Sequence, residues 1–373
     1  MTLILRVEYH SSEAATLRRL RPKVWVGVLN RNGREWLLGC LDSVSRTDYP
    51  DLEVAVLDNA STDGSQELVR ARFPWVRLVA FKQNVGFTSA YNTLLQECTA
   101  PYLVLLNNDA VAADPSWLEH LVAAMEEDVT VAAASCKMLY LDRCQQINSV
   151  GGKAFWWTGS FDVGDGERDE GQYDSPPLEP FSFCGGAAIL RVDAVREVGG
   201  FDESMFAYRE DFDLSWRLRL KGYRIVYVPK ARIYHFGGAT WGPLSYDKIY
   251  LSSRHWLRAM LKNYSGLTLL RALAGYLFYE FAIRMPGLVW VSRSAHYALV
   301  PFHSLLWNVR QAGNTLQARR ESQRHRRVSD AVILQVMGPA GFEPLAHIAR
   351  RARNLQQVHQ ERSPRRASSS PEL

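Results

Sequence analysis

Carboxylate and amide side chains stand at or just after the ends of three short apolar runs, where they could bind a polar ligand. These residues are Asn30, Asp58 and Asp109. A carboxylate at such a position can accept hydrogen bonds from a base or a ribose, or coordinate a hard divalent cation that bridges a diphosphate. Asn107 is a weaker ligand than an aspartate, so we expect Asp109 to supply most of the metal binding. The competing interpretation is a capped turn.

A glycine-containing stretch from Asn84 to Asn92 could bring backbone N–H groups close to a ligand. Gly86 permits a close backbone approach just before a predicted helix, and Asn92 lies two turns into that helix. An ordinary loop–helix junction explains the same stretch. The amides Asn59 and Asn108 adjoin the acids at the strand ends, and we predict that they help to bind the same ligand.

Three acids lie within four residues at Glu210, Asp211 and Asp213, at the start of a predicted helix. One of these carboxylates could face a cleft as a general base, and clustering raises the pKa of carboxylic acids, which suits a base. The alternative is that the acids only complement the positive end of the helix dipole. Asp213 could equally pair with Arg217 one turn later.

His235 follows a strand-like stretch and precedes a pair of glycines. A lone histidine is more often structural. Here the glycine pair would let the loop fold onto the site, where the imidazole could provide a metal ligand.

The elements that must position these side chains alternate in type along the first part of the chain. Residues 24–29, 52–57, 76–81 and 102–106 read as buried strands, and helical spacing separates them. This alternation is typical of a parallel sheet with helices on both faces, whose ligands bind beyond the carboxyl ends of the strands. The strand-end acids and amides should therefore meet at one edge of the sheet.

The remaining organisation follows from shifts in composition. We predict an N-terminal extension over 1–22, an α/β domain over 23–245, an amphipathic helical region over 246–310 and a basic, disordered tail over 311–373. Within the α/β domain, residues 151–180 are rich in Gly, Asp and Pro, and we expect a long irregular loop that could act as a lid.

The amphipathic region mixes aromatic and aliphatic residues with single charges, which favours helices lying on a membrane surface. The alternative is a helical packing layer or an oligomer interface. No stretch reaches about 18 uninterrupted apolar residues, so the sequence indicates no spanning helix. The N-terminus lacks the apolar core of a signal peptide.

Charge and cysteine usage exclude several classes of protein. The net charge is +5, but the segment from Arg310 to the end carries 12 arginines and 5 acids, so the rest of the chain is slightly acidic. That body gives no electrostatic argument for nucleic-acid binding. The five cysteines show neither paired zinc spacing nor a disulfide framework, which is typical of buried thiols in a reducing cytoplasm.

Taken in order, these stretches resemble the family 2 glycosyltransferases with a GT-A fold, in particular the rhamnosyltransferase-like branch that builds bacterial surface polysaccharides. The resemblance runs roughly from Val24 to Tyr264 and includes VLDNASTDGS, NVGFTSAYN, LLNNDA and the long stretch from FCGG to HFGG. It implies a Rossmann-like mixed α/β sheet flanked by helices, followed by the C-terminal amphipathic helices.

The resemblance also implies roles at the donor side of the site. Asp58 would contact the nucleotide base, and Asp109 would be the last acid of a DxD-like metal motif. The family often has Asp where Asn107 stands, which leaves one metal ligand open. His235 would be a further contact to the metal, Mn²⁺ or Mg²⁺, or to the diphosphate.

On the acceptor side, the resemblance implies that Asp211, in the Glu210-Asp211 pair, deprotonates the acceptor hydroxyl. The Cys184-Gly185-Gly186 stretch would line that side. The implied reaction is a single displacement that inverts the anomeric carbon, with a glycan or lipid-linked acceptor. The branch favours deoxythymidine-diphosphate-rhamnose as the donor, and UDP- and GDP-sugars remain open alternatives. The enzyme would be cytoplasmic, with peripheral association at the inner face of the cell membrane.

Two other classes of function use part of the same pattern. A nucleotidyltransferase acting on sugar phosphates also uses acidic strand ends and a metal, but it usually has a Gly-rich basic loop after the first strand. This chain has only Asn30-Arg31-Asn32-Gly33 there. A non-catalytic sugar-binding homologue would not need the intact acids at Glu210 and Asp211.

Overall fold

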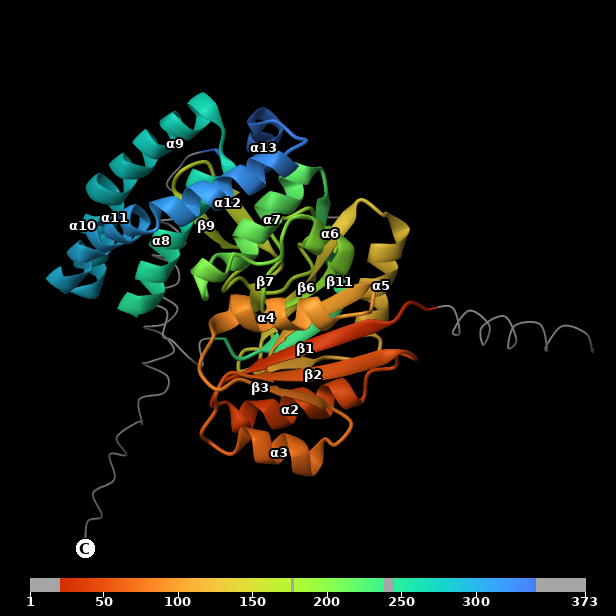
Figure 1. Cartoon of the computed structure of the whole chain (residues 1–373). Coiled ribbons are helices and arrows are strands. Elements are labelled where there is room, and N and C mark those ends of the chain that lie inside the picture. Colours follow the sequence, from red (N-terminus) through yellow and green to blue (C-terminus); the bar gives the residue numbers. More distant parts are fainter. Residues whose placement is uncertain (1–20, 176–177, 238–244, 340–373) are drawn as a thin grey trace, which may run out of the picture.

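The computed structural model describes residues 21–175, 178–237 and 245–339. Its centre is a mixed sheet of nine strands in the order β3-β2-β1-β4-β10-β6-β11-β5, with β7 paired to β6 (Figure 1). The strand bounds are β1 Val24–Asn30, β2 Leu52–Asp58, β3 Arg77–Ala80, β4 Tyr102–Asn107, β5 Ala110–Ala112, β6 Val131–Tyr140, β7 Ile147–Ser149, β10 Ala187–Arg191 and β11 Arg224–His235.

The register of the first strands places the predicted polar residues beside one another. β1 is parallel to both β2 and β4, with Asn30 opposite Asp58 and Leu29 opposite Asn107. These strands are apolar almost throughout because both faces of this half of the sheet are covered. The sheet becomes mixed where β10 enters antiparallel between β4 and β6.

Helices pack on both faces of the sheet, as the alternating pattern predicts. Figure 1 shows α2 and α3 on one side of β1 and β2 and α4 on the other. One buried cluster joins the sheet to α2 and α5, and a second joins it to α4, α6 and α7. The bounds are α2 Arg34–Ser45, α3 Ser65–Arg72, α4 Gly86–Glu97, α5 Trp117–Glu127, α6 Val192–Glu197 and α7 Glu210–Lys221, with the 3-10 turn η1 at Glu203–Met205.

The C-terminal helices gather at one end of the molecule, against α7 (Figure 1). A third apolar cluster, which includes Trp216, Trp256 and Tyr264, lies between α7 and these helices. Their bounds are α8 Tyr246–Asn263, α9 Gly266–Phe278, the π-helical segment η2 Tyr279–Arg284, α10 Met285–Ser292, the 3-10 segment η3 Ala295–Leu299, α11 Val300–Arg310, α12 Ala312–His325 and α13 Asp330–Val336.

The expected disordered tail over 311–373 is wrong for its first part. α12 and α13 are ordered helices because several of their charged residues bind inside the molecule. Arg319 donates to the carbonyl oxygens of Leu261 and Tyr264, and Arg326 pairs with Asp330 at 2.8 Å. Residues 340–373 lie outside the described residues, as do residues 1–20 of the predicted N-terminal extension.

The expected long loop over 151–180 contains regular structure. β8 (Gly152–Phe155) and β9 (Gly159–Asp162) form an antiparallel hairpin, and the backbone of Gly152 pairs with Ser182. This hairpin carries side chains to the site described below.

One helical run among the described residues is long and apolar enough, by length and composition alone, to cross a membrane. It spans Gly266–Ser292, and 22% of its most apolar 18-residue stretch is buried inside the protein. The sequence expectation counted uninterrupted apolar residues and therefore stopped at Arg271 and Glu280. A buried core helix passes the same test, so the run by itself does not establish a membrane span.

Candidate active site

A cavity of about 670 Å³ opens beyond the carboxyl ends of β1 and β4 and continues toward the C-terminal helices. At one end its walls come from the strand-end loops, including Asn59, Asn84 and Asp109. Its other walls come from the β9 hairpin, the start of α7, helix α8, the π-helical segment η2 and helix α10. Most of the predicted site residues lie in these walls: Asn59, Asn84, Gly86, Asn107, Asn108, Asp109, Glu210, Asp211 and His235.

The predicted metal residues form one corner of the cavity. Oδ1 of Asp109 lies 3.1 Å from Nε2 of His235, and the Nδ2 group of Asn107 lies 3.2 Å from the same nitrogen. These side chains meet because β5, which follows Asp109, pairs antiparallel with the end of β11. Burial alone would raise the pKa of Asp109, but the neighbouring His235 and backbone N–H donors outweigh it and lower that pKa.

The donor atoms in this corner fit a hard divalent cation. Nδ1 of His235 lies 2.9 Å from Oδ1 of Asn148, and this contact orients the ring so that Nε2 faces Asp109, where it could coordinate a cation. No three His, Cys, Asp or Glu side chains gather as a metal cluster within residues 21–175, 178–237 and 245–339. Two strong ligands suit Mg²⁺ or Mn²⁺, which commonly take their remaining oxygens from phosphates and water.

Asn30 and Asp58 lie one layer behind the cavity wall and are fully buried. Asn30 donates to Oδ2 of Asp58 at 3.0 Å and accepts from Nδ2 of Asn108 at 2.7 Å. Oδ1 of Asp58 accepts from Nε2 of Gln66 at 2.8 Å and from the N–H of Ser61. A base contact by Asp58 stays a prediction, and it requires Gln66 to release the carboxylate.

Asn59, Asn84 and Gly86 shape the loop before α4. Asn59 accepts from the N–H of Val85 at 2.8 Å and donates to the carbonyl of Gly86, while Asn84 accepts from the N–H of Gly86. Gly86 has φ +80°, and a Cβ there would lie 2.5 Å from Cδ2 of Phe206. Glycine is therefore required because the Phe206 side chain packs against the backbone, a contact that the sequence did not reveal.

Asn92 does not line the cavity, which corrects its assignment as a ligand-binding residue. Its Nδ2 group donates to the carbonyl of Phe201 at 2.9 Å and to Glu203, and its Oδ1 accepts from the N–H of Phe201. The side chain is nearly buried because it lies two turns into α4, against the segment that leads to α7. Asn92 is thus a structural residue that holds this segment.

Glu210 and Asp211, at the start of α7, face the cavity without a cationic partner in ion-pair contact among the described residues. Asp211 accepts from the N–H of Gly185 at 3.2 Å and from the N–H of Phe212 at 2.8 Å. Oε2 of Glu210 is buried and has no hydrogen-bond partner in the described part of the chain. The backbone at Gly185 therefore orients Asp211, and the Cys184-Gly185-Gly186 stretch lies beside it. That this stretch lines the acceptor side stays a prediction.

The environment raises the pKa of both acids. Burial, followed by repulsion from Asp211, raises the pKa of Glu210 to about 8. Burial, followed by repulsion from Asp162 on β9, raises the pKa of Asp211 to about 6. The raised pKa values of the pair suit a group that accepts a proton near neutral pH. The N–H groups of Gly185 and Phe212 favour the ionised form of Asp211, so Asp211 is the member better placed to accept that proton.

The backbone just before these acids adopts an unusual conformation. Phe206, Tyr208 and Arg209 all have positive φ, at 59°, 67° and 72°. Non-glycine residues rarely adopt such angles and do so where the surroundings enforce them. Here the carbonyl of Phe206 accepts from the N–H of Phe87 at 2.7 Å, and the carbonyl of Tyr208 lies 2.8 Å from Nδ1 of His255.

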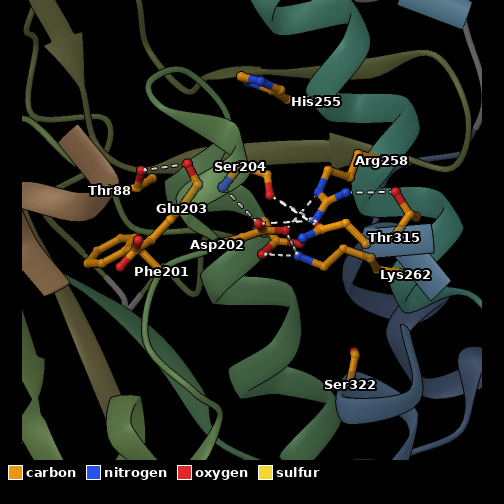
Figure 2. A network of polar contacts seen from close by, with 12 residues as sticks. Thr88, Phe201, Asp202, Glu203, Ser204, His255, Arg258, Lys262, Thr315 and Ser322 are labelled. Carbon is orange, nitrogen blue, oxygen red and sulfur yellow. Dashed lines mark hydrogen bonds and ion pairs between the residues drawn. The ribbon is translucent and has the colours of Figure 1, made fainter. Parts of the chain in front are cut away.

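A second group of charged residues holds the same segment on its far side (Figure 2). Asp202 binds Arg258 and Lys262 of α8, and Lys262 also lies 2.9 Å from Asp213. Asp213 pairs with Arg217 at 2.9 Å, which confirms the pairing weighed from the sequence.

Further cavity residues were not identified from the sequence. They come from the β9 hairpin, from the residues before α7 and from the C-terminal helices, and no motif connects these distant segments. The clustered acids gave the only signal near them. These residues are Ser160, Asp162, Phe206, Arg209, Trp256, Tyr279, Glu280 and Arg284.

Comparisons of the sequence with known proteins agree on one family of enzymes. Residues 24–199 match the model for glycosyl transferase family 2. The Mycobacterium tuberculosis N-acetylglucosaminyl-diphospho-decaprenol L-rhamnosyltransferase is 30% identical over 262 residues, which cover 60% of this chain and 82% of that protein. The Myxococcus xanthus O-antigen biosynthesis protein RfbC is 26% identical over 235 residues, which cover 59% of this chain but 18% of that protein.

A solved structure shares the architecture at low sequence identity. The crystal structure of GalNAc-T7 with UDP, GalNAc and Mn²⁺ has a TM-score of 0.54 and 17% identity, and the match covers 72% of this chain and 51% of that one. At this identity the likeness shows the shared fold.

Proposed function

The chain belongs to glycosyl transferase family 2 and has the GT-A fold, and we propose that it transfers rhamnose from a nucleoside diphosphate to a lipid-linked glycan. That it is a glycosyltransferase follows from the family, as the sequence predicted. One observation supports the proposed chemistry most strongly. The Asp109–His235 corner and the carboxylate of Asp211 line the same cavity, in which the two substrates would meet.

The donor would occupy the end formed by the strand-end loops. Asp109, His235 and Asn107 would hold a divalent cation, which when bound neutralises charge developing on the departing nucleoside diphosphate. Asn59 and Asn84 would place amide groups along the nucleoside. The buried Asn30–Asp58–Asn108 chain of hydrogen bonds would keep these loops in place, and Asp58 would contact the base after Gln66 moves away.

The acceptor hydroxyl would bind beside Asp211. In one displacement the hydroxyl oxygen forms a bond to the anomeric carbon, the bond from that carbon to the diphosphate oxygen breaks, and the hydroxyl proton passes to Asp211. The N–H groups of Gly185 and Phe212 hold the carboxylate in position without neutralising it. Attack from the face opposite the leaving group inverts the anomeric configuration.

Rhamnose and a lipid-linked acceptor are proposed because the Mycobacterium tuberculosis relative carries both in its name. Support from this chain comes from α9 and α10, which expose Leu270, Phe278 and Trp290 while the same helical run lines the cavity. We therefore place the enzyme at the inner face of the cell membrane. Flotation with anionic vesicles tests this placement, and a chain that stays with the soluble fraction would contradict it.

A thermal-shift screen across nucleotide sugars tests the donor assignment. We expect deoxythymidine-diphosphate-rhamnose with Mn²⁺ or Mg²⁺ to stabilise the protein by about 2.7 kcal/mol at 100 times its Kd. EDTA and the Asp109→Asn variant should each remove that shift. If EDTA left the shift intact, Asp109 would not be part of a metal site.

A product assay separates this function from its alternatives. A glycosyltransferase releases the nucleoside diphosphate, whereas a nucleotidyltransferase releases pyrophosphate from a nucleoside triphosphate and a sugar phosphate. A non-catalytic homologue would bind the donor and release neither product, even with an acceptor present.

A further inference from the structure

The acceptor end of the cavity contains two arginines that the proposed proton transfer does not use. Arg209 immediately precedes Glu210, and Arg284 ends the π-helical segment η2. Both line the cavity, and they are close enough for the charge on Arg284 to lower the pKa of Arg209, after burial as the larger cause. Two guanidinium groups that approach in a partly enclosed space repel each other unless an anion lies between them.

The partners of these two arginines leave hydrogen-bonding capacity for a ligand. Arg284 uses one nitrogen, Nη1, to bind both carboxylate oxygens of Glu280, at 2.7 and 2.9 Å. Arg209 donates to the neutral hydroxyl of Ser160 and stacks over the ring of Phe212, with 5.3 Å from its central carbon to the ring centroid. Among the described residues no carboxylate lies within ion-pair distance of Arg209.

Acids surround this pair, but in the described part of the chain only Glu280 binds it directly. Asp211 and Asp162 attract Arg209 at longer range, and burial raises the pKa of Glu210, which favours its neutral form. Glu280 balances Arg284 in a salt bridge that is almost buried. One guanidinium charge thus lacks a directly bound counter-ion, and an anionic group of the substrate could supply it.

The geometry of η2 indicates that Arg284 is presented to the cavity by a local departure from the α-helix. Its wider turn brings residues five apart onto one face, and π-helical turns often occur at functional sites. Tyr279, Glu280 and Arg284 line the cavity, while Phe278, the residue before η2, is 64% exposed on the outer surface. A Cβ on Gly275 would lie 2.5 Å from Cδ2 of Trp157, so glycine allows α9 to pack closely at this end.

We propose that Arg209 and Arg284 form a subsite for a phosphate group of the acceptor. This inference rests on the proposed function, because it assigns the arginines to the substrate whose hydroxyl meets Asp211. A lipid-linked sugar places its phosphates between the sugar and the apolar chain. The molecule offers the matching features in the same order: Asp211 for the hydroxyl, the two arginines for phosphate, and the exposed apolar face of α9 and α10 for the lipid.

Calorimetric binding of two probes with the same sugar tests the subsite. One is N-acetylglucosamine linked through a diphosphate to a short polyprenyl chain, and the other is octyl N-acetylglucosaminide, which has no phosphate. EDTA in both titrations prevents a metal at the Asp109 corner from binding the diphosphate. We expect the wild-type protein to bind the diphosphate probe at least about tenfold more tightly, as charge-assisted hydrogen bonds to two arginines allow.

The test variant is the double substitution Glu280→Gln/Arg284→Gln, which avoids leaving Glu280 as a buried, unpaired charge. It should lose most of the preference for the diphosphate probe while binding the octyl glycoside as before, which a misfolded protein could not do. Arg271→Gln is the matched control, because Arg271 is exposed on α9 and lies outside the cavity. It should keep the full preference.

Three results would overturn the subsite. First, the wild-type protein could bind the diphosphate probe and the octyl glycoside equally tightly. Second, the double variant could keep the preference for the diphosphate probe. Third, UDP could displace the diphosphate probe from the wild-type protein but not from the double variant. The third result would assign the arginines to the donor. Transfer of sugar is measured separately. Absence of transfer with an intact binding preference would contradict the proposed function and leave the subsite standing.

Discussion

Two pairs of acids on one short segment of the chain are in opposite electrostatic states. Asp202 and Asp213 bind cations from α7 and α8, and despite burial the attraction of Lys262 lowers the pKa of both. Glu210 and Asp211 lie between them in sequence, face the cavity without bound cations, and have raised pKa values. Carboxylic acids therefore have two roles in this segment. Asp202 and Asp213 hold it against α8, and the Glu210–Asp211 pair provides a proton acceptor at the cavity.

This difference shows what the C-terminal helices contribute to the site. α8 supplies Arg258 and Lys262, and these two cations bind Asp202 and Asp213 rather than the acids that face the cavity. Arg258 also binds Thr315 of α12, which extends the network to a later helix (Figure 2). A general base needs a raised pKa, and it keeps one only if such cations are held elsewhere.

The substitution Asp211→Asn should have the largest effect on activity. Removing the proton acceptor lowers kcat by about 10³-fold, within the range for general bases, while donor affinity and Tm stay near wild-type values. Steady-state kinetics with a donor-binding titration measures both. If kcat fell by less than tenfold, Asp211 would not be the base.

Lys262→Met should have the largest effect on stability. It removes a cation shared by Asp202 and Asp213, and loss of one partner from a buried ionic cluster destabilises by about 3 kcal/mol. Urea unfolding measures the change. Adding Asp213→Asn to the same chain should restore part of the loss, and a double variant as unstable as the single one would argue against the shared ion pair.

Glu210→Gln should change how stability depends on pH. A carboxyl whose folded pKa is raised contributes stability that is fully present below its unfolded pKa of about 4.5 and is lost progressively as pH rises to the folded value of about 8. The variant, which cannot ionise, should melt together with wild type near pH 4.5 and about 2 °C or more above it near pH 9. Asp202 and Asp213, with lowered values, should lose their contribution only in acid. Identical melting curves at all pH values would contradict the raised pKa.

Glu97→Gln should have the smallest effect. Glu97 pairs with Arg77 on the surface, where both side chains are more than 40% exposed. Surface pairs contribute about 0–1 kcal/mol, so the free energy of unfolding should change by about 0.5 kcal/mol or less. A loss of unfolding free energy equal to that of Lys262→Met would mean that burial does not explain the strength of the ion pairs that Lys262 makes with Asp202 and Asp213.

The strand ends could be predicted from the sequence because their signals are local. Apolar runs that stop at Asn30, Asp58 and Asn107 are strands that end at those residues. The three acids at the start of α7 could be found from the sequence, but their separate roles could not be assigned. Whether an acid faces a lysine or a cavity depends on partners about 50 residues away, such as Lys262 for Asp213.

The C-terminal region shows more clearly what could not be predicted from the sequence. Arg258 and Lys262 interrupt an apolar stretch and looked like the polar side of a surface helix, yet both are buried. Arg319 and Arg326 looked like a solvated basic run, yet they bind backbone carbonyl groups. The spacing of charged residues along the chain predicts a helix. It does not predict which charges are buried, because the partner that allows a charge to be buried lies elsewhere in the chain.

The pH dependence of kcat/KM in wild type and in Asp162→Asn tests the central claim most directly, because this ratio reports the ionisation of the free enzyme. Asp162 repels Asp211 and helps to raise its pKa to about 6. The account predicts that wild-type kcat/KM rises with pH with an apparent pKa near 6, and that this rise moves to lower pH in Asp162→Asn. A profile with no acid limb, or one that does not move in the variant, would contradict the assignment of Asp211 as the base.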